Sequence, residues 1–134
     1  MEPFPEEDEL RELFGAEPAL LDPGAAWREN ALSFDVIRGD DRVECLIEPV
    51  YRTLSLRWTR DGKELVYLDL TGVRGIAADQ YRGRDSLLVT FDHENQSGLR
   101  PLRIQIRPAV HVTWGTRDDA EQRPASEGHY QLGL

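Results

Sequence analysis

The sequence predicts a mainly β fold of the α+β class: an antiparallel meander of about seven strands, forming a sandwich or an open barrel, after one short helix. Three observations predict it. Apolar and polar side chains alternate with a period of two in short segments from residue 32 to residue 114. Turn signals separate those segments at near-regular spacing. No helical segment of about 10–15 residues lies between them to connect parallel strands.

The first expected element is a short helix near residues 6–14, EEDELRELF. Its first turn is acidic, where the positive end of the helix dipole favours carboxylates. Leu10, Leu13 and Phe14 have the i, i+3, i+4 spacing of one apolar stripe. Gly15 suits the C-cap of this helix.

A connector over residues 16–27 follows, and we expect it to pack Leu20, Leu21 and Trp27 on the body of the protein. From residue 31 the apolar period changes to two, as in strands with one buried face. Strands are expected in LSFDVIR, RVECLIE, TLSLRWT, ELVYLDL and SLLVTFD, with hairpin turns at GDD and RDGK. A bend and a short irregular strand are expected in TGVRGIAADQY, followed by a further turn at RGRD.

Two of the later segments carry particular expectations. ELVYLDL (64–70) is apolar on both faces, which predicts a central strand covered on both sides, with the helix as a candidate cover. Residues 102–114 are apolar at the even positions and predict one long strand that closes the sheet. Pro108 implies a bulge or an unpaired edge there, so Arg107 and His111 are expected on the wet face of an edge strand.

The length of 134 residues predicts a single β-rich domain over residues 1–115, followed by a polar, flexible tail at 116–134. The N-terminus is acidic where a signal peptide requires basic residues, and no apolar run is long enough to cross a membrane. We therefore expect a cytoplasmic protein that binds no membrane.

The net charge of −9 is unevenly distributed. Residues 1–50 contain 14 acids and 4 bases (−10), residues 51–115 contain 7 and 10 (+3), and residues 116–134 contain 4 and 2 (−2). A strongly acidic chain repels phosphate backbones, so nucleic-acid binding is not expected. It instead accelerates encounter with a basic protein.

The sequence nominates no catalytic centre, no metal site and no cofactor. Cys45 alternates with apolar neighbours and is interpreted as a core residue rather than a catalytic thiol. DHE at residues 92–94 is interpreted as a hydrated loop. His111 has no pattern-defined partner, and no serine lies on a nucleophile elbow. We therefore predict that the protein is not an enzyme.

Five segments resemble bacterial immunity proteins of the immunity-protein-50 type, which are small cytoplasmic proteins encoded with secreted polymorphic toxins. The resemblance covers roughly residues 10–115, with L-x-G-V-R-x-I as its most distinctive element. The connection at 48–52 is shorter than in that family, and the acidic front and tail have no counterpart in it. The resemblance implies a role but transfers no site residues. It is carried by LFGAEPALLD, LSFDVIRGDDRVECLIE, LDLTGVRGI, LLVTF and LRIQIRPAVHVTW.

Two functions follow as hypotheses. The first is an immunity protein that neutralises a basic cognate toxin by direct binding, through aromatic or arginine anchors ringed by polar contacts. The alternative is a barrel-like ligand-binding or adaptor module that recognises an anionic ligand through the arginines of its sheet. Such arginines also serve ordinary cross-strand ion pairs. The candidate partner-binding residues are Glu44, Glu48, Tyr51, Tyr81, Asp92, Glu94, Arg103 and Arg107.

Overall fold

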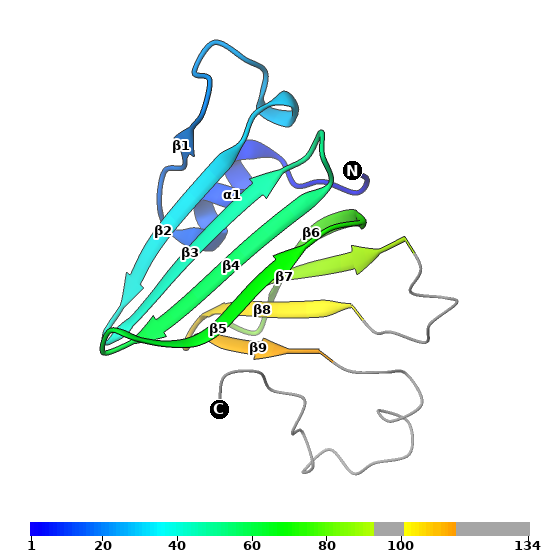
Figure 1. The fold of residues 1–134 in the computed structure, drawn as a ribbon. Coiled ribbons are helices and arrows are strands. Elements are labelled where there is room, and N and C mark those ends of the chain that lie inside the picture. The colour runs from blue at the N-terminus through cyan, green and yellow to red at the C-terminus, as the bar shows by residue number, and fades with distance from the viewer. Residues whose placement is uncertain (93–100, 115–134) are drawn as a thin grey trace, which may run out of the picture.

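The computed structural model describes residues 1–92 and 101–114, which fold into two antiparallel sheets and one α-helix (Figure 1). One sheet has the order β1-β2-β3-β4-β5, with bounds Ala19–Leu20, Leu32–Arg38, Asp41–Glu48, Thr53–Arg60 and Lys63–Leu70. The other has the order β6-β7-β8-β9, with bounds Val73–Tyr81, Arg84–Phe91, Leu102–Arg107 and His111–Thr113. The mainly β, α+β class is confirmed. The described ranges hold nine strands rather than about seven, and the two additional strands are β1 and β9, which were not predicted as separate strands.

The helix α1 (Glu7–Phe14) confirms the N-terminal prediction. Glu6 and Glu9 form a reciprocal capping box at its start, and Gly15 ends it in the left-handed conformation. Its apolar stripe is fully buried, and the Phe14 ring stacks on the Phe34 ring of β2 at 4.1 Å. In Figure 1, α1 lies behind β2 and β3. The helix therefore covers part of the inner face of the five-stranded sheet.

The core lies between the two sheets and α1. The alternation in β2, β3 and β4 directs every second side chain inward, and the four-stranded sheet supplies the facing layer. Trp58 is the largest of the fully buried side chains, and its indole Nε1 donates a hydrogen bond to the Asp41 carboxylate at 2.9 Å. Cys45 is buried in this core, as expected.

The N-terminal segment lies along the outer edge of β6. The Glu2 amide donates to the Arg74 carbonyl at 2.9 Å, and the Ile76 amide donates to the Pro3 carbonyl at 2.8 Å. Gly75 lies between these two bonds, where a Cβ atom would come within 2.4 Å of the Glu2 carbonyl oxygen. This edge of the four-stranded sheet is thereby partly paired.

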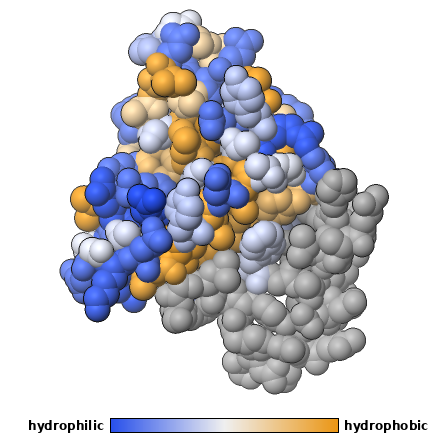
Figure 2. Space-filling view, in the orientation of Figure 1, coloured by the Kyte–Doolittle hydropathy of each residue, from blue (hydrophilic) through white to orange (hydrophobic). Residues whose placement is uncertain are grey.

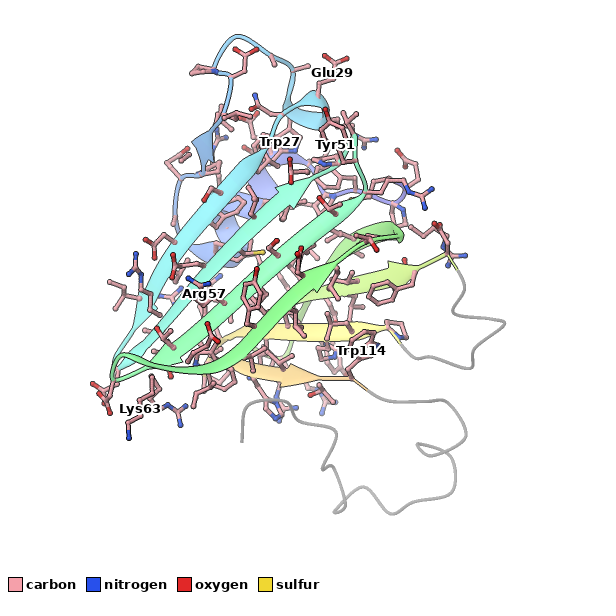
Figure 3. All side chains as sticks on the ribbon, in the orientation of Figure 1. Trp27, Glu29, Tyr51, Arg57, Lys63 and Trp114 are labelled. Atoms are coloured by element: carbon pink, nitrogen blue, oxygen red, sulfur yellow. The ribbon has the colours of Figure 1, made fainter. Side chains whose placement is uncertain are left out.

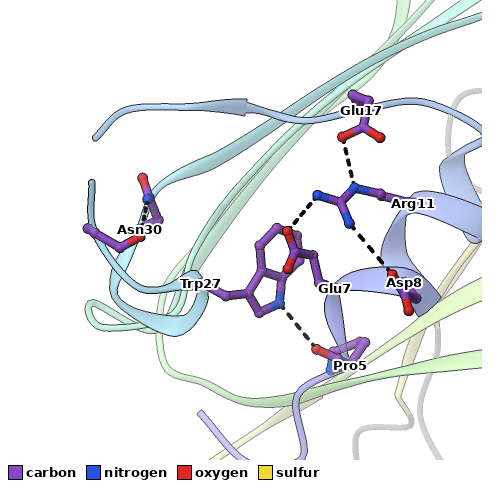
Figure 4. Close-up of polar contacts among 8 residues, drawn as sticks. Pro5, Glu7, Asp8, Arg11, Glu17, Trp27 and Asn30 are labelled. Carbon is purple, nitrogen blue, oxygen red and sulfur yellow. Dashed lines mark hydrogen bonds and ion pairs between the residues drawn. The ribbon is translucent and has the colours of Figure 1, made fainter. Parts of the chain in front are cut away.

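Polar contacts fix the helix and the connector to the body (Figure 4). Arg11 forms ion pairs with Glu7, Asp8 and Glu17, and the Trp27 indole donates to the Pro5 carbonyl. Leu20 and Trp27 pack against the core, as predicted. The prediction for Leu21 is wrong, because this side chain is exposed beside the 3₁₀ turn Trp27–Glu29.

Two strand predictions need correction. β5 is an edge strand rather than a central one: Leu65 is the extra residue of a bulge opposite β4, and Tyr67 lies on the outer face. Residues 102–114 form the hairpin β8–β9 instead of one strand. Of these two strands, only β9 lies at an edge of its sheet, whereas β8 lies between β7 and β9. The prediction that places Arg107 on an edge strand is therefore wrong.

Some predictions fall outside the described residues, namely the tail at 116–134, residue Glu94 and most of the DHE loop. Among the described residues, no helix is long and apolar enough to span a bilayer.

The Asp41 carboxylate predicts a pH dependence of stability. A hydrogen bond from Arg60 lowers its pKa, burial opposes this, and the Trp58 indole lowers it further. Since the folded-state pKa lies below the unfolded value of about 3.9, the stabilisation is present above that pH and is lost as pH falls through the folded pKa. Urea unfolding at pH 7 and pH 3 should show a smaller acid-induced loss for Asp41→Asn than for the wild type.

The exposed Asp8 provides the matched control, because its side chain is 98% accessible. Asp8→Asn should retain the wild-type pH dependence. Equal acid-induced losses in Asp41→Asn and the wild type would contradict this role of Asp41.

Candidate partner-binding surface

The outer face of the five-stranded sheet, here called the acidic face, has no described element packed on it (Figure 1). The antiparallel register aligns its side chains in four rows that run across the strands. In order, the rows are Ile37-Arg42-Thr59-Glu64, Asp35-Glu44-Arg57-Tyr67, Ser33-Leu46-Ser55-Asp69 and Glu48-Thr53.

Both arginines of the acidic face are paired within the first two rows. Arg42 donates two hydrogen bonds to Asp35, at 3.0 and 2.7 Å, and these bonds lower the pKa of that carboxyl group. Arg57 pairs with Glu64 at 3.1 Å, and its guanidinium lies 5.1 Å from the centre of the Tyr67 ring. Figure 3 shows Arg57 on the outside of the sheet. The positive charge of this face is thus neutralised locally.

The last two rows carry carboxylates without such partners. Among the described residues, Glu48 and Asp69 form no ion pair and only accept hydrogen bonds from the hydroxyls of Thr53 and Ser55, each at 3.3 Å. With five acids against two arginines, the acidic face has a net charge of −3. Two of these three charges lie in the last two rows, and the third lies in the second row, where Glu44 is 3.9 Å from Arg42, which already pairs with Asp35. The five acids are Asp35, Glu44, Glu48, Glu64 and Asp69.

A shallow hollow of about 190 Å³ opens in this face around Leu46. The short side chains of Ser33 and Ser55 flank Leu46 in the third row, while Arg57 and Tyr67 rise beside them in the second. Leu46 is 36% exposed and Tyr67 52% exposed. Figure 2 shows this side of the molecule, where hydrophobic patches interrupt the hydrophilic surface.

The outer face of the four-stranded sheet has a different charge pattern. Arg103 pairs with Asp79 at 2.9 Å, and Arg107 pairs with Asp85 and donates to the Glu12 carbonyl. Each predicted arginine therefore has an acid beside it. Neither arginine lines the hollow around Leu46.

The remaining predicted residues lie apart from the acidic face. Tyr51, 75% exposed, is in the β3–β4 turn at the end of the molecule that also holds Trp27 and Glu29 (Figure 3). Asp92 follows β7 and pairs with Arg52 of that turn. Tyr81 ends β6, on the other sheet, and stacks with Arg82.

A second hollow of about 250 Å³ lies at the Tyr51 end, between the N-terminal segment and the β3–β4 turn. Arg28 and Arg52 line it, and each is already paired, with Glu2 and Asp92 respectively. Exposed Val50 lies on its rim. This hollow is therefore polar, with its charges balanced.

Of the predicted site residues, the structure brings together Glu44 and Glu48 on β3. Sequence reasoning missed Leu46, Tyr67 and Asp69. The period-two alternation of β3 was a usable signal for Leu46, since it lies between the two glutamates. Tyr67 and Asp69 join them only through the β4–β5 register, which a bulge shifts.

Cys45 is the one cysteine of the chain, and it is buried. Burial raises the pKa of the Cys45 thiol to about 12, which keeps it in its unreactive form. Within residues 1–92 and 101–114, no group of three or more His, Cys, Asp or Glu side chains could hold a metal ion. The features that do stand out are surfaces suited to contact with another molecule.

The chain thus folds as a sandwich of two sheets, and the outer face of its five-stranded sheet is open and charged. The chain is similar to a chain in a solved contact-dependent growth inhibition toxin–immunity protein complex from Klebsiella pneumoniae 342. The TM-score is 0.67 at 16% sequence identity, over 84% of this chain and 94% of that one. No protein-family model matches the sequence, and no curated protein matches it. The likeness shows that this chain shares the fold of a chain of that complex.

Proposed function

We propose that this protein is an immunity protein, which binds a cognate toxin directly and neutralises it in the cytoplasm of the producing cell. The observation that carries the proposal is the likeness of its fold to a chain of a toxin–immunity protein complex. The sequence resemblance to immunity proteins points the same way. The role requires a binding surface and no catalytic group, cofactor or metal.

The charge of the chain supports a basic toxin as the partner. A net charge of −9 attracts a basic protein over distances of about a Debye length, roughly 8 Å at physiological salt. The same charge disfavours nucleic acid as the partner. Inhibition then follows if the bound protein covers the surface through which the toxin reaches its substrate.

The alternative of an anionic ligand on the arginine-bearing sheet gains no support from the geometry. Arg103 and Arg107 are engaged by Asp79 and Asp85. An added anion would have to compete with these carboxylates for each guanidinium group.

The test is to purify the chain with the product of the neighbouring gene, which the proposal identifies as the toxin. We expect a stable complex that co-elutes in size-exclusion chromatography at low salt. Because charge steers the association, the affinity should fall by about tenfold or more between 0.05 and 0.5 M salt. If the two proteins elute separately at low salt, the proposed function is wrong.

A further inference from the structure

We propose that the partner docks on the acidic face, and that the hollow around Leu46 receives the stem of a lysine or arginine from a basic protein surface. The head group of that side chain pairs with Glu48, and a second basic side chain pairs with Asp69. The proposal rests on the proposed function for the identity of the partner, but its chemistry is defined by the face itself.

The third row forms the floor of the hollow. Ser33 and Ser55 are short, so the side chain of Leu46 forms an accessible apolar floor between them. Lysine and arginine bury their methylene stems on such surfaces while the charged end reaches out to a carboxylate. The ring of Tyr67 borders the same hollow and adds to its apolar lining.

The two carboxylates without ion pairs lie close to Leu46 on the same face. Glu48 lies two residues from Leu46 on the same strand and face, about 6–7 Å away along β3. Asp69 ends the row of Leu46 two strands away, about 10 Å across the sheet. Because these two offsets run at right angles, Glu48 and Asp69 are about 12 Å apart, and the face matches a partner with two basic side chains at roughly that separation.

Arg57 also borders the hollow, and its positive charge would repel an incoming cation. Glu64, in the first row, pairs with its guanidinium at 3.1 Å, on the side away from Leu46. Its charge is thus compensated before the partner arrives. Arg42 is bound in the same way by Asp35.

Charge complementarity selects this occupant over others. A second copy of the chain would bring acids against acids, which costs binding energy. A nucleic acid would meet the same repulsion through its phosphates. A basic protein surface can place the methylene stem of a lysine or arginine in the hollow and its charged groups beside the unpaired carboxylates.

The test uses hexalysine as a probe, so it does not require the toxin. We expect hexalysine added to the ¹⁵N-labelled full chain at low salt to shift the amide signals of Leu46, Ser55 and Asp69 most strongly, while hexaglutamate leaves them unchanged. The double variant E48K/D69K should bind hexalysine about tenfold or more weakly.

The matched control is E12K/E29K, which alters two exposed acids away from this face. Each double variant changes the net charge by the same amount, from −9 to −5 (two substitutions of +2). The control should lose no more than about threefold in affinity. Equal losses in the two variants, or shifts centred on α1, would overturn the assignment, because the binding would then depend on net charge alone.

Three further outcomes also decide the matter. A concentration-dependent dimer that E48K/D69K abolishes would assign this face to a second copy and overturn the proposal. If hexalysine maps elsewhere while the chain still forms the toxin complex, the docking face is wrong and the proposed function stands. If hexalysine maps to Leu46 but no toxin complex forms, the proposed function fails while the chemistry of the face is retained.

Discussion

Replacing Trp58 by alanine is expected to remove about 3–5 kcal/mol from the free energy of unfolding. Trp58 is 1% exposed, and it lies on the inner face of β4, between β3 and β5. Its loss leaves a cavity that the surrounding strands can fill only in part. It also removes the hydrogen bond from its indole to Asp41. Because small domains have only about 5–15 kcal/mol of stability in total, this is a large share.

Trp27→Ala is the control with the same chemical change. Trp27 is only half-buried, and its indole donates a longer hydrogen bond, 3.4 Å, to the Pro5 carbonyl. We expect it to lose clearly less stability than Trp58→Ala in urea titrations followed by circular dichroism. Similar losses for the two variants would contradict the central position of Trp58 in the core.

The second large effect is expected at Gly75, where Gly75→Ala should destabilise the protein by about 1–3 kcal/mol. The added Cβ atom would lie 2.4 Å from the Glu2 carbonyl oxygen and 2.6 Å from Pro3 Cδ. The N-terminal segment must then move away from β6 and loses the hydrogen bonds at Arg74 and Ile76. Thermal or urea unfolding measures the cost.

Two comparisons make this prediction specific. Gly24→Ala should be nearly neutral, because the nearest atom to its added Cβ is Asp22 Oδ1 at 3.5 Å, an ordinary contact. Removal of residues 1–3 should abolish most of the difference between the wild type and Gly75→Ala, since the clash is with that segment. A Gly75→Ala penalty that persists after this removal would show that another contact is responsible.

Local patterns predicted the elements whose signals lie within a few residues. The helix from Glu7 to Phe14 could be located because its capping residues and its apolar stripe are contiguous. The hairpin between β4 and β5 followed from Asp61-Gly62. In both cases neighbouring residues determine the structure, so distant contacts were not needed.

The C-terminal segment shows where alternation alone is insufficient. Ile104 pairs with Val112 across the β8–β9 hairpin, so an even position faces an even position. The alternating phase therefore continues through the turn near Pro108, and a hairpin and one long strand give the same pattern. The buried even positions were predicted correctly, whereas the number of strands was not.

The candidate surface was predictable only along a single strand. Glu44 and Glu48 share a face because they lie four residues apart on β3. Tyr67 and Asp69 reach that face through the pairing of β5 with β4, and the bulge at Leu65 shifts this register by one residue. The grouping of Arg103 with the acids failed because the chain crosses to the second sheet after β5.

The most direct test of the account is protection of growing cells from the toxin. The product of the neighbouring gene is induced in a host that carries either this chain or an empty plasmid, and the growth of the two cultures is compared at the same level of that product. The account predicts that cells with the chain continue to grow while those with the empty plasmid arrest. Arrest of both cultures, with the chain present and soluble, would contradict its role as an immunity protein.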